Sequence, residues 1–481
     1  MRSIPILRSL FARGSPLLVI SGLEVGFPFV RMLALSHFLD VRELGFASLL
    51  AATYSTFEQV TDIAMYRFVL SAPREVFAEA LASAHALSAL RGLVVGALAV
   101  AAAPLLASGF GVGTDWPSFA VLGPLTVIHS LEHIGPRIAE RDYRYDVQLR
   151  IALIGCAAGF LALGAAIALR PDHNALVASL FGTISGQTIA SHALAGTPYR
   201  LRIRSPEFRK AFRFGYPLMF NGVGLAISAQ GDRLLVGAML GLPALGVYSV
   251  LLLVSVVPIS PIVRVTGSVT VAMLVNASNS SQALTARLSC MARLTPAVAT
   301  LYSAGIIALM NIVVPPVFGA KFTASRWTLV LLAAAAFTRI VRSEPGTSVL
   351  LYQARTKRLA LANVLATSGL LFAFLLMMLI PSIETAVLGR LAGEFLGLAA
   401  MIVLSRKAFG SALVDFFVSV GLGFALLAAM TPMTFALGVG ERISPSIAML
   451  IVVLGLCGSW IWRPISRLPF GDYFRPTEDK Q

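Results

Sequence analysis

Arg339 and Arg342 lie three residues apart in the middle of a long apolar run. Three residues are close to one helical turn, so both guanidinium groups fall on one face of a helix. Because an arginine fork matches two phosphate oxygens at once, the pair could bind a diphosphate. Alternatively, the arginines form an internal ion pair, with Glu344 or another residue of the same lobe, that serves packing alone. The segment Glu344-Pro345-Gly346 that follows is expected to break or kink the helix.

Three further arginines interrupt apolar runs, namely Arg31, Arg233 and Arg264. A charge within such a run is tolerated where it faces the protein interior or a wet cavity. We therefore expect all three to contribute to an anion-binding site. The alternatives are that Arg31 reaches an interface, that Arg233 pairs structurally with Asp232, and that Arg264 anchors a helix end.

Glu58 and Asp62 are acidic residues four apart in another apolar run. This spacing puts them on one helix face, where two carboxylates repel each other and favour binding of a proton or a sodium ion. They are the leading candidates for ion coupling, and Glu24 and Glu394 are weaker ones. The alternative is that the pair neutralises Arg31 or Arg67.

One short segment concentrates polar groups, carried by His129, Glu132, His133 and Arg137. Zinc sites with a similar His-x-x-Glu-His sequence motif need a third ligand and a water-filled pocket, and neither can be identified from the sequence. We therefore predict no metal, and interpret the segment as a polar patch facing a cavity or as hydrogen-bonding contacts between helices. No nucleotide-binding lysine motif is found either, so we expect no cofactor.

The elements that must position these residues are membrane helices. Hydrophobic residues make up 57% of the 481 residues and charged residues 13%, which is about half the charged share of a soluble domain. Apolar runs of about 20 residues recur along the chain and predict an all-α integral membrane protein with about 14 transmembrane helices. The expected spans are 16–38, 44–68, 86–108, 117–137, 148–169, 175–196, 212–238, 245–271, 294–316, 326–352, 359–381, 385–404, 412–437 and 446–463.

The distribution of basic residues predicts the orientation. Most of the 38 lysine and arginine residues fall in loops on one side, which should face the cytoplasm together with both termini. Arg67, Arg74 and Arg91 are assigned to one of these basic loops. The opposite side carries Arg42, Arg170, Lys321, Arg326 and Arg442. The net charge of +15 then reflects contact with anionic membrane lipids, and no nucleic acid partner is implied. The excess of arginine over lysine is typical of a GC-rich bacterial gene and indicates the bacterial inner membrane.

Two sets of matching residues recur about 200 positions apart. Gly14-Ser15-Pro16-Leu17 matches Gly215-Tyr216-Pro217-Leu218, and Leu44-Gly45 matches Leu245-Gly246. An even number of spans in each half makes the halves parallel repeats, an arrangement typical of transporters with a site between the halves. We expect six-helix lobes over 1–198 and 199–405, followed by two additional spans and a tail over 406–481.

The segment Gly231-Asp232-Arg233-Leu234-Leu235-Val236-Gly237, with Leu245-Gly246-Val247-Tyr248-Ser249 and Val317-Phe318-Gly319-Ala320-Lys321-Phe322, resembles a known family. It is similar to Wzx-type polysaccharide flippases of the multidrug/oligosaccharidyl-lipid/polysaccharide exporter superfamily. The resemblance implies two lobes that alternate access to a central cavity. The implied cargo is a lipid-linked oligosaccharide on undecaprenyl diphosphate, for envelope or secreted polysaccharide. Implied partners are membrane lipids and the polysaccharide polymerase and chain-length machinery, with proton or sodium coupling and no enzymatic activity.

Three other functions stay open at this point. Lipid II or cationic drugs are alternative cargoes for the same scaffold, and a membrane polysaccharide polymerase or ligase is a third reading. A drug exporter should have a cavity dominated by carboxylates, whereas the arginines here favour an anion. Polymerases and ligases resemble one another in carrying a large outer loop with reactive residues, and the expected outer loops of this chain are short.

Overall fold

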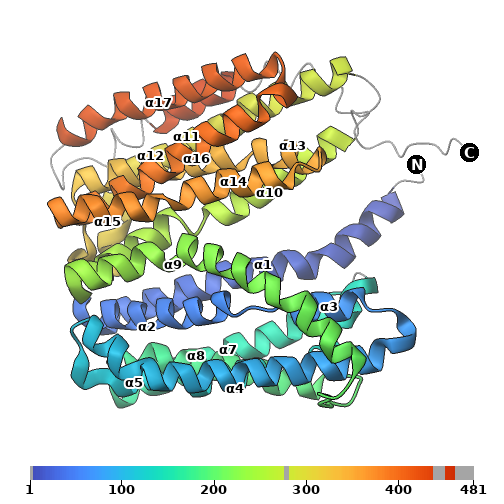
Figure 1. Cartoon of the computed structure of the whole chain (residues 1–481). Coiled ribbons are helices and arrows are strands. Elements are labelled where there is room, and N and C mark those ends of the chain that lie inside the picture. Colours follow the sequence, from blue (N-terminus) through green and yellow to red (C-terminus); the bar gives the residue numbers. More distant parts are fainter. Residues whose placement is uncertain (1–3, 143, 276–280, 437–449, 461–481) are drawn as a thin grey trace, which may run out of the picture. The chain divides into compact units, whose positions relative to one another are not determined.

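The computed structural model describes residues 4–142, 144–275, 281–436 and 450–460, and every regular element within those ranges is a helix (Figure 1). Eight helical stretches of this part of the chain are long and apolar enough to cross a membrane. The prediction of an all-helical membrane protein is therefore confirmed. The C-terminal tail and both ends of the last expected span, 446–463, lie outside the described residues.

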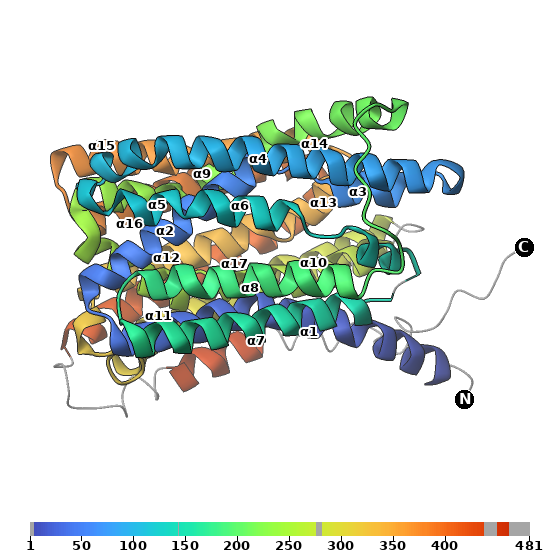
Figure 2. The ribbon, with the colours of Figure 1, turned by 90° about the horizontal axis from the view of Figure 1, so that it is seen from below.

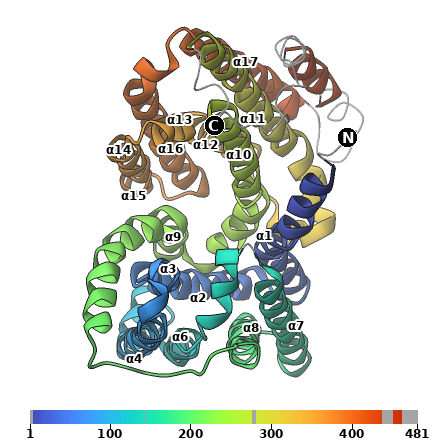
Figure 3. The same ribbon diagram turned by 90° about the vertical axis from the view of Figure 1, so that its right-hand side faces the viewer.

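The chain divides into two compact units, Met1–Val250 and Leu251–Gln481. The expected lobes 1–198 and 199–405 and the additional segment 406–481 were defined by sequence repetition, and they stay a prediction. The first unit contains α1 (Ile4–Phe38), α2 (Val41–Val60), α3 (Met65–Ser71), η1 (Arg74–Val76), α4 (Phe77–Gly109), η2 (Gly113–Asp115), α5 (Trp116–Ala120), α6 (Leu122–Ser130), η3 (Gly135–Asp142), α7 (Asp146–Leu169), α8 (Asn174–Ala193) and most of α9 (Pro206–Ser255). Seen end-on, α4, α6, α8 and α7 follow one another along one side of this unit (Figure 3).

The second unit is built in the same way from long apolar helices. It contains α10 (Ile259–Val275), α11 (Ser281–Phe318), η4 (Ala320–Phe322), α12 (Arg326–Ser343), α13 (Gly346–Tyr352), α14 (Thr356–Thr367), α15 (Gly369–Leu379), α16 (Ile383–Phe409), α17 (Ala412–Ala436) and the helical residues 450–460. The predicted break at Glu344-Pro345-Gly346 is confirmed, because α12 ends before it and α13 begins after it. Proline has no N–H to continue the helical hydrogen bonds.

The two repeated Leu-Gly motifs contact each other inside the first unit. A Cβ on Gly45 would lie 1.8 Å from the carbonyl oxygen of Leu242, and a Cβ on Gly246 would lie 2.2 Å from that of Val41. Each glycine therefore faces the residue four positions before the other glycine, which is a reciprocal contact. Gly241 permits it, because its φ of 80° redirects α9 just before the second motif. The repeat found in the sequence thus marks a crossing of two helices at backbone contact.

Small residues bring other helix pairs together in the same manner. Gly155 and Gly186 face each other between α7 and α8, which run side by side in Figure 2. On α16, Gly389 and Gly393 lie against the backbones of Ala373 and Gly369. Without a hydrophobic driving force between helices in lipid, such close approach supplies much of the packing.

Two of the expected spans of the first unit are interrupted within their predicted length. The span expected over 44–68 is interrupted between Val60 and Met65, and the span expected over 117–137 is interrupted between Ser130 and Gly135. The sequence does not reveal the first break, because the polar residues around it also fit one face of a continuous helix. At both breaks, side chains bind backbone groups that the helix would otherwise pair. The Asp62 carboxylate accepts from the backbone N–H of Ala64 at 2.7 Å.

The second break is held by histidine and serine side chains. The backbone N–H of Ile134 donates to His85 at 3.1 Å, and that of His133 donates to the Ser191 hydroxyl at 2.8 Å. Pro136 further disfavours helical continuation through Gly135. Interrupted helices within a membrane occur where protein or water can satisfy the exposed backbone groups.

We predict that Gly45→Ala and Gly246→Ala each destabilise the protein, because the new methyl group overlaps backbone atoms that cannot move aside. Overpacking of this kind costs about 1–3 kcal/mol. The midpoint of thermal unfolding in detergent should fall by several degrees. Gly164→Ala is the matched control, since nothing lies within 4 Å of a Cβ there, and its midpoint should stay equal or rise. Equal midpoints for all three variants would contradict the reciprocal contact.

Candidate functional site

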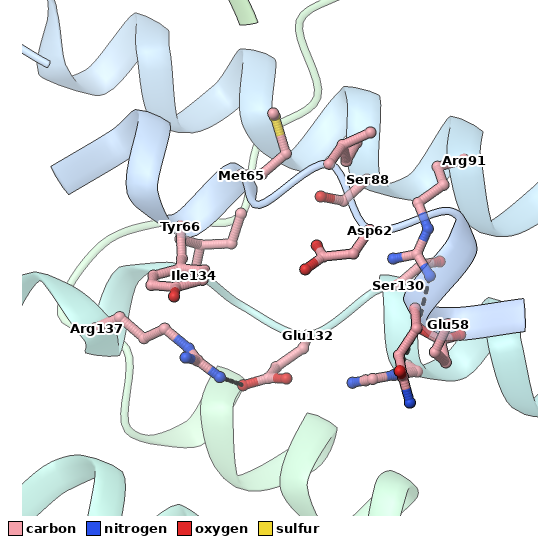
Figure 4. A pocket seen from close by; sticks show the side chains of 13 residues that line it. Glu58, Asp62, Met65, Tyr66, Ser88, Arg91, Ser130, Glu132, Ile134 and Arg137 are labelled. Atoms are coloured by element: carbon pink, nitrogen blue, oxygen red, sulfur yellow. Dashed lines mark hydrogen bonds and ion pairs between the residues drawn. The ribbon is translucent and has the colours of Figure 1, made fainter. Parts of the chain in front are cut away.

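The two helix breaks of the first unit border one polar pocket of about 310 Å³ (Figure 4). It is lined by Glu58, Gln59, Asp62, Ile63, Met65, Tyr66, Ser88, Arg91, His129, Ser130, Glu132, Ile134 and Arg137. Three carboxylates, two guanidiniums and an imidazole therefore surround a space that can hold several water molecules. The pocket lies at the lower end of the size range for small-molecule sites.

Glu58 is the most heavily engaged of these carboxylates. Its Oε2 lies 2.5 Å from Nη2 of Arg91 and 3.1 Å from Nδ1 of His129, and its side chain is 14% exposed. Arg91 also donates from Nε to the Thr61 hydroxyl at 3.1 Å. Nδ1 of His129 lies 3.0 Å from the hydroxyl of Tyr54 as well. One carboxylate thus ties α2 to both α4 and α6.

Asp62 and Glu132 face the pocket from the two opposing breaks (Figure 4). The sequence predicted that Glu58 and Asp62 share one helix face. This prediction was wrong, because α2 ends at Val60, before Asp62. Glu132 lies 3.8 Å from Nη2 of Arg137, whose guanidinium also covers the Tyr66 ring at 5.0 Å. The arrangement is a charge network rather than a self-repelling pair of carboxylates.

The polar patch predicted from His129 to Arg137 is divided by the break. His129, Glu132 and Arg137 line the pocket, whereas His133 is 2% exposed and binds backbone. Its Nε2 donates to the Thr197 carbonyl at 3.0 Å, and its Nδ1 accepts from Gly135 at 2.9 Å. His133 therefore supports the chain around the break and does not face the pocket.

Arg31 is half-buried in α1. Its guanidinium carbon lies 5.4 Å from the centre of the Phe27 ring, a cation–π contact. Within the part of the chain that the structure describes, Arg31 forms no ion pair with a carboxylate. Glu58 forms its ion pair with Arg91. It therefore does not neutralise Arg31 or Arg67, which was the alternative considered from the sequence.

The pair Arg339 and Arg342 lies in the second unit, on α12. Arg342 donates from Nε to Oε2 of Glu394 at 2.7 Å and from Nη1 to Oδ1 of Asn363 at 2.9 Å. Arg342 and Glu394 are 12% and 9% exposed, so this is a buried ion pair. Glu344, the partner first considered, instead accepts from the Ser348 hydroxyl at 2.7 Å.

Glu394 faces more than one cation. The charges of Arg339 and Arg390 act on the same carboxylate as Arg342. Space for the Arg342 side chain is left by Gly397, whose Cβ would lie 2.7 Å from Cδ of Arg342. Three arginines on two helices therefore act on one carboxylate.

The remaining predicted site residues are spread out. Asp232 is buried and accepts from the Tyr248 hydroxyl at 2.9 Å, and Arg233 donates to Gln230 at 3.2 Å, which places both in the first unit. Arg264 is exposed on α10 of the second unit, and Glu24 is exposed on α1. None of these lines the polar pocket.

Comparison with known proteins identifies the family. Residues 34–326 match a family described as "Polysaccharide biosynthesis protein". The chain belongs to this polysaccharide biosynthesis family. No curated protein matches its sequence.

Among solved structures, this member of the family is similar to the lipid II flippase MurJ in an inward closed conformation, with a TM-score of 0.70 and 12% identity over 95% of this chain and 100% of that one. It is also similar to an inward-facing multidrug resistance MATE family transporter of the MOP superfamily, with a TM-score of 0.56 and 14% identity over 84% of this chain and 95% of that one. At these identities the likeness shows a shared fold: the family member has a MurJ- and MATE-like transporter fold.

Sequence reasoning missed two arginines of this family member. Arg91 was assigned to a basic loop, although it lies within α4 and pairs with Glu58. Arg390 was not considered at all. Its position inside an apolar run, four residues before Glu394, was the signal that could have identified it.

We predict that Arg342→Met strongly destabilises this family member, because Glu394 then keeps a buried charge without its closest partner. Breaking such a pair costs about 3–5 kcal/mol, whereas replacing both partners with apolar residues can be neutral. The double variant Arg342→Met/Glu394→Leu should therefore recover most of the lost thermal stability in detergent. A double variant as unstable as the single one would contradict the pairing.

Proposed function

We propose that this chain is a flippase that moves an undecaprenyl-diphosphate-linked oligosaccharide across the bacterial inner membrane by alternating access. The product would enter envelope or secreted polysaccharide. The observation that carries the proposal is the family match over residues 34–326, on a chain with a transporter fold. In this proposal both termini face the cytoplasm, and the chain acts by transport and not as an enzyme.

The substrate's diphosphate would be recognised by arginine. Arg31 supports this role because it is half-buried and forms no ion pair with a carboxylate among the described residues. A cation held in an apolar helix without a counter-charge favours a bound anion. Arg339 and Arg342 would contribute together with Arg390, because all three guanidinium groups are gathered around the carboxylate of Glu394.

The polar pocket of the first unit would carry the coupling ion. A volume of about 310 Å³ suits ions and water better than an oligosaccharide. Protonation of Glu58, or a cation bound beside it, would weaken its attraction to Arg91 and His129. The links from α2 to α4 and α6 would then loosen, which gives an ion a direct means of shifting a conformational equilibrium.

Lipid II is a second candidate cargo. The observation in its favour is the likeness in fold to the lipid II flippase MurJ over 95% of this chain. Because both cargoes carry the same lipid diphosphate, arginines that bind one would bind the other. Cationic drugs fit less well, since the arginines favour an anion.

We predict that Arg31→Gln abolishes polysaccharide export while the protein remains in the membrane. The measurement is surface polysaccharide in cells that lack the chromosomal gene, with membrane abundance determined in parallel. Arg355→Gln, in a basic loop of the second unit, is the matched control and should export normally. Normal export by Arg31→Gln would reject the assigned role of Arg31.

We predict further that the wild-type chain does not restore growth to cells depleted of their lipid II flippase, because the family match points to other glycans. Colony formation during depletion is the readout, with a known lipid II flippase as the positive control. Growth sustained by this chain would assign lipid II as its cargo instead.

A further inference from the structure

A basic cavity of about 760 Å³ lies at the start of α9, in the first unit. It is lined by Ile203, Arg204, Ser205, Pro206, Phe208, Arg209, Lys210 and Arg213. Four of these residues are cations. Figure 3 shows the linker that leads to this point, crossing the end of the unit from α8 past α4 to the first turn of α9.

The linker between α8 and α9 is held against α4 by hydrogen bonds and a ring contact. The backbone N–H of Arg202 donates to the Ala82 carbonyl at 3.2 Å, and the hydroxyls of Ser205 and Ser83 lie 2.8 Å apart. Tyr199 stacks on His85 at 4.3 Å between ring centres, and burial raises the pKa of its hydroxyl. The cavity is therefore bordered by a chain segment held in one place.

The first turns of α9 have two distinct faces. Ala211 is completely buried against α3 and α4, and Phe208 packs beside it. Arg209 and Arg213 are exposed and, being four residues apart, extend from the same side of the helix. The packed face thus fixes the direction in which the charged face points.

The charges on this face are largely uncompensated. Glu207 is buried and pairs with Lys210 at 2.7 Å. Within the described ranges, Arg204, Arg209 and Arg213 form no ion pair with any carboxylate. Their three guanidinium groups are available to bind phosphate, because each can donate two parallel hydrogen bonds to phosphate oxygens.

Aromatic residues follow the charges along the same side of α9. Tyr216 is 49% exposed and Phe220 is 77% exposed. With a rise of about 1.5 Å per residue, they lie roughly 10–16 Å further along the helix than Arg209. The order of charges and then exposed aromatic rings matches the change from lipid headgroups to the edge of the hydrocarbon core.

We propose that this cavity is a binding site for an anionic glycerophospholipid of the cytoplasmic leaflet. Arg204, Arg209 and Arg213 hold the headgroup phosphate, and the acyl chains lie along Tyr216 and Phe220. Basic pockets on the cytoplasmic side of membrane proteins favour such headgroups by charge complementarity. None of its lining residues belongs to the polar pocket or to the arginines assigned to the transported cargo.

The test is native mass spectrometry of the full-length protein titrated with phosphatidylglycerol and, separately, with phosphatidylcholine. One variant combines Arg204→Gln, Arg209→Gln and Arg213→Gln. The control combines Lys357→Gln, Arg406→Gln and Lys407→Gln, which removes the same charge from exposed positions of the second unit. Since each surface cation contributes roughly a factor of five to anionic-lipid binding, the first variant should bind phosphatidylglycerol about 100-fold more weakly. The control should stay within twofold of wild type.

The single variant Arg213→Gln keeps the test decisive if the triple variant does not fold, and it should weaken phosphatidylglycerol binding about fivefold. Equal losses in the first variant and the control would overturn the proposal, as would wild-type affinity for phosphatidylcholine equal to that for phosphatidylglycerol. Undecaprenyl diphosphate displacing phosphatidylglycerol from the wild type at equimolar concentration would also overturn it, because the cavity would then be a cargo site. None of these readouts requires transport, so they stand or fall separately from the proposed flippase function.

Discussion

A polar group at membrane depth must find its partner inside the protein, and this constraint organises the first unit. Two spans break there, and each break frees backbone N–H groups that lipid cannot satisfy. Asp62 satisfies one break, and His85 and Ser191 satisfy the other. Of these side chains, Asp62 also lines the polar pocket, where the two breaks bring further charged groups together.

Charge is handled differently in the two units. In the first, the carboxylate of Glu58 is shared by a guanidinium and an imidazole, at the edge of a pocket large enough for several water molecules. In the second, the carboxylate of Glu394 is buried and three arginines act on it. The first arrangement is the one to which the proposed function assigns the coupling ion. The second suits either a rigid contact between helices or attraction of an anion. Comparing the Arg342→Met and Arg342→Met/Glu394→Leu variants separates the stability contributed by the ion pair from the cost of leaving Glu394 buried without its partner.

Much of the fold could be predicted from the sequence because its signals are local. The apolar runs predicted membrane helices, and Pro345 predicted the end of α12. The Leu-Gly repeat was visible in the sequence, but the meeting of Gly45 and Gly246 was not, since it depends on the turn at Gly241. The break after Val60 was missed because Glu58 and Asp62, four residues apart, were interpreted as two positions on one face of a continuous helix.

The site was harder to predict than the fold because its partners are distant in the chain. Glu58 was correctly singled out as a buried acid, yet its partner Arg91 lies 33 residues away and resembled a loop residue. Arg342 was singled out together with the possibility of an ion pair, but Glu394, 52 residues away, could not be chosen over Glu344. Side-chain pairing between helices follows from tertiary packing, and one sequence does not encode it as a visible pattern.

The most direct test of this account is ion-driven flipping in proteoliposomes. Fluorescently labelled lipid-linked oligosaccharide is placed in one leaflet, and its arrival in the other is followed with and without an imposed proton or sodium gradient. The account predicts that the gradient accelerates flipping by the wild type, and that Glu58→Gln flips at a single rate whether or not the gradient is present. Full gradient dependence in Glu58→Gln would contradict the assignment of the polar pocket as the coupling site.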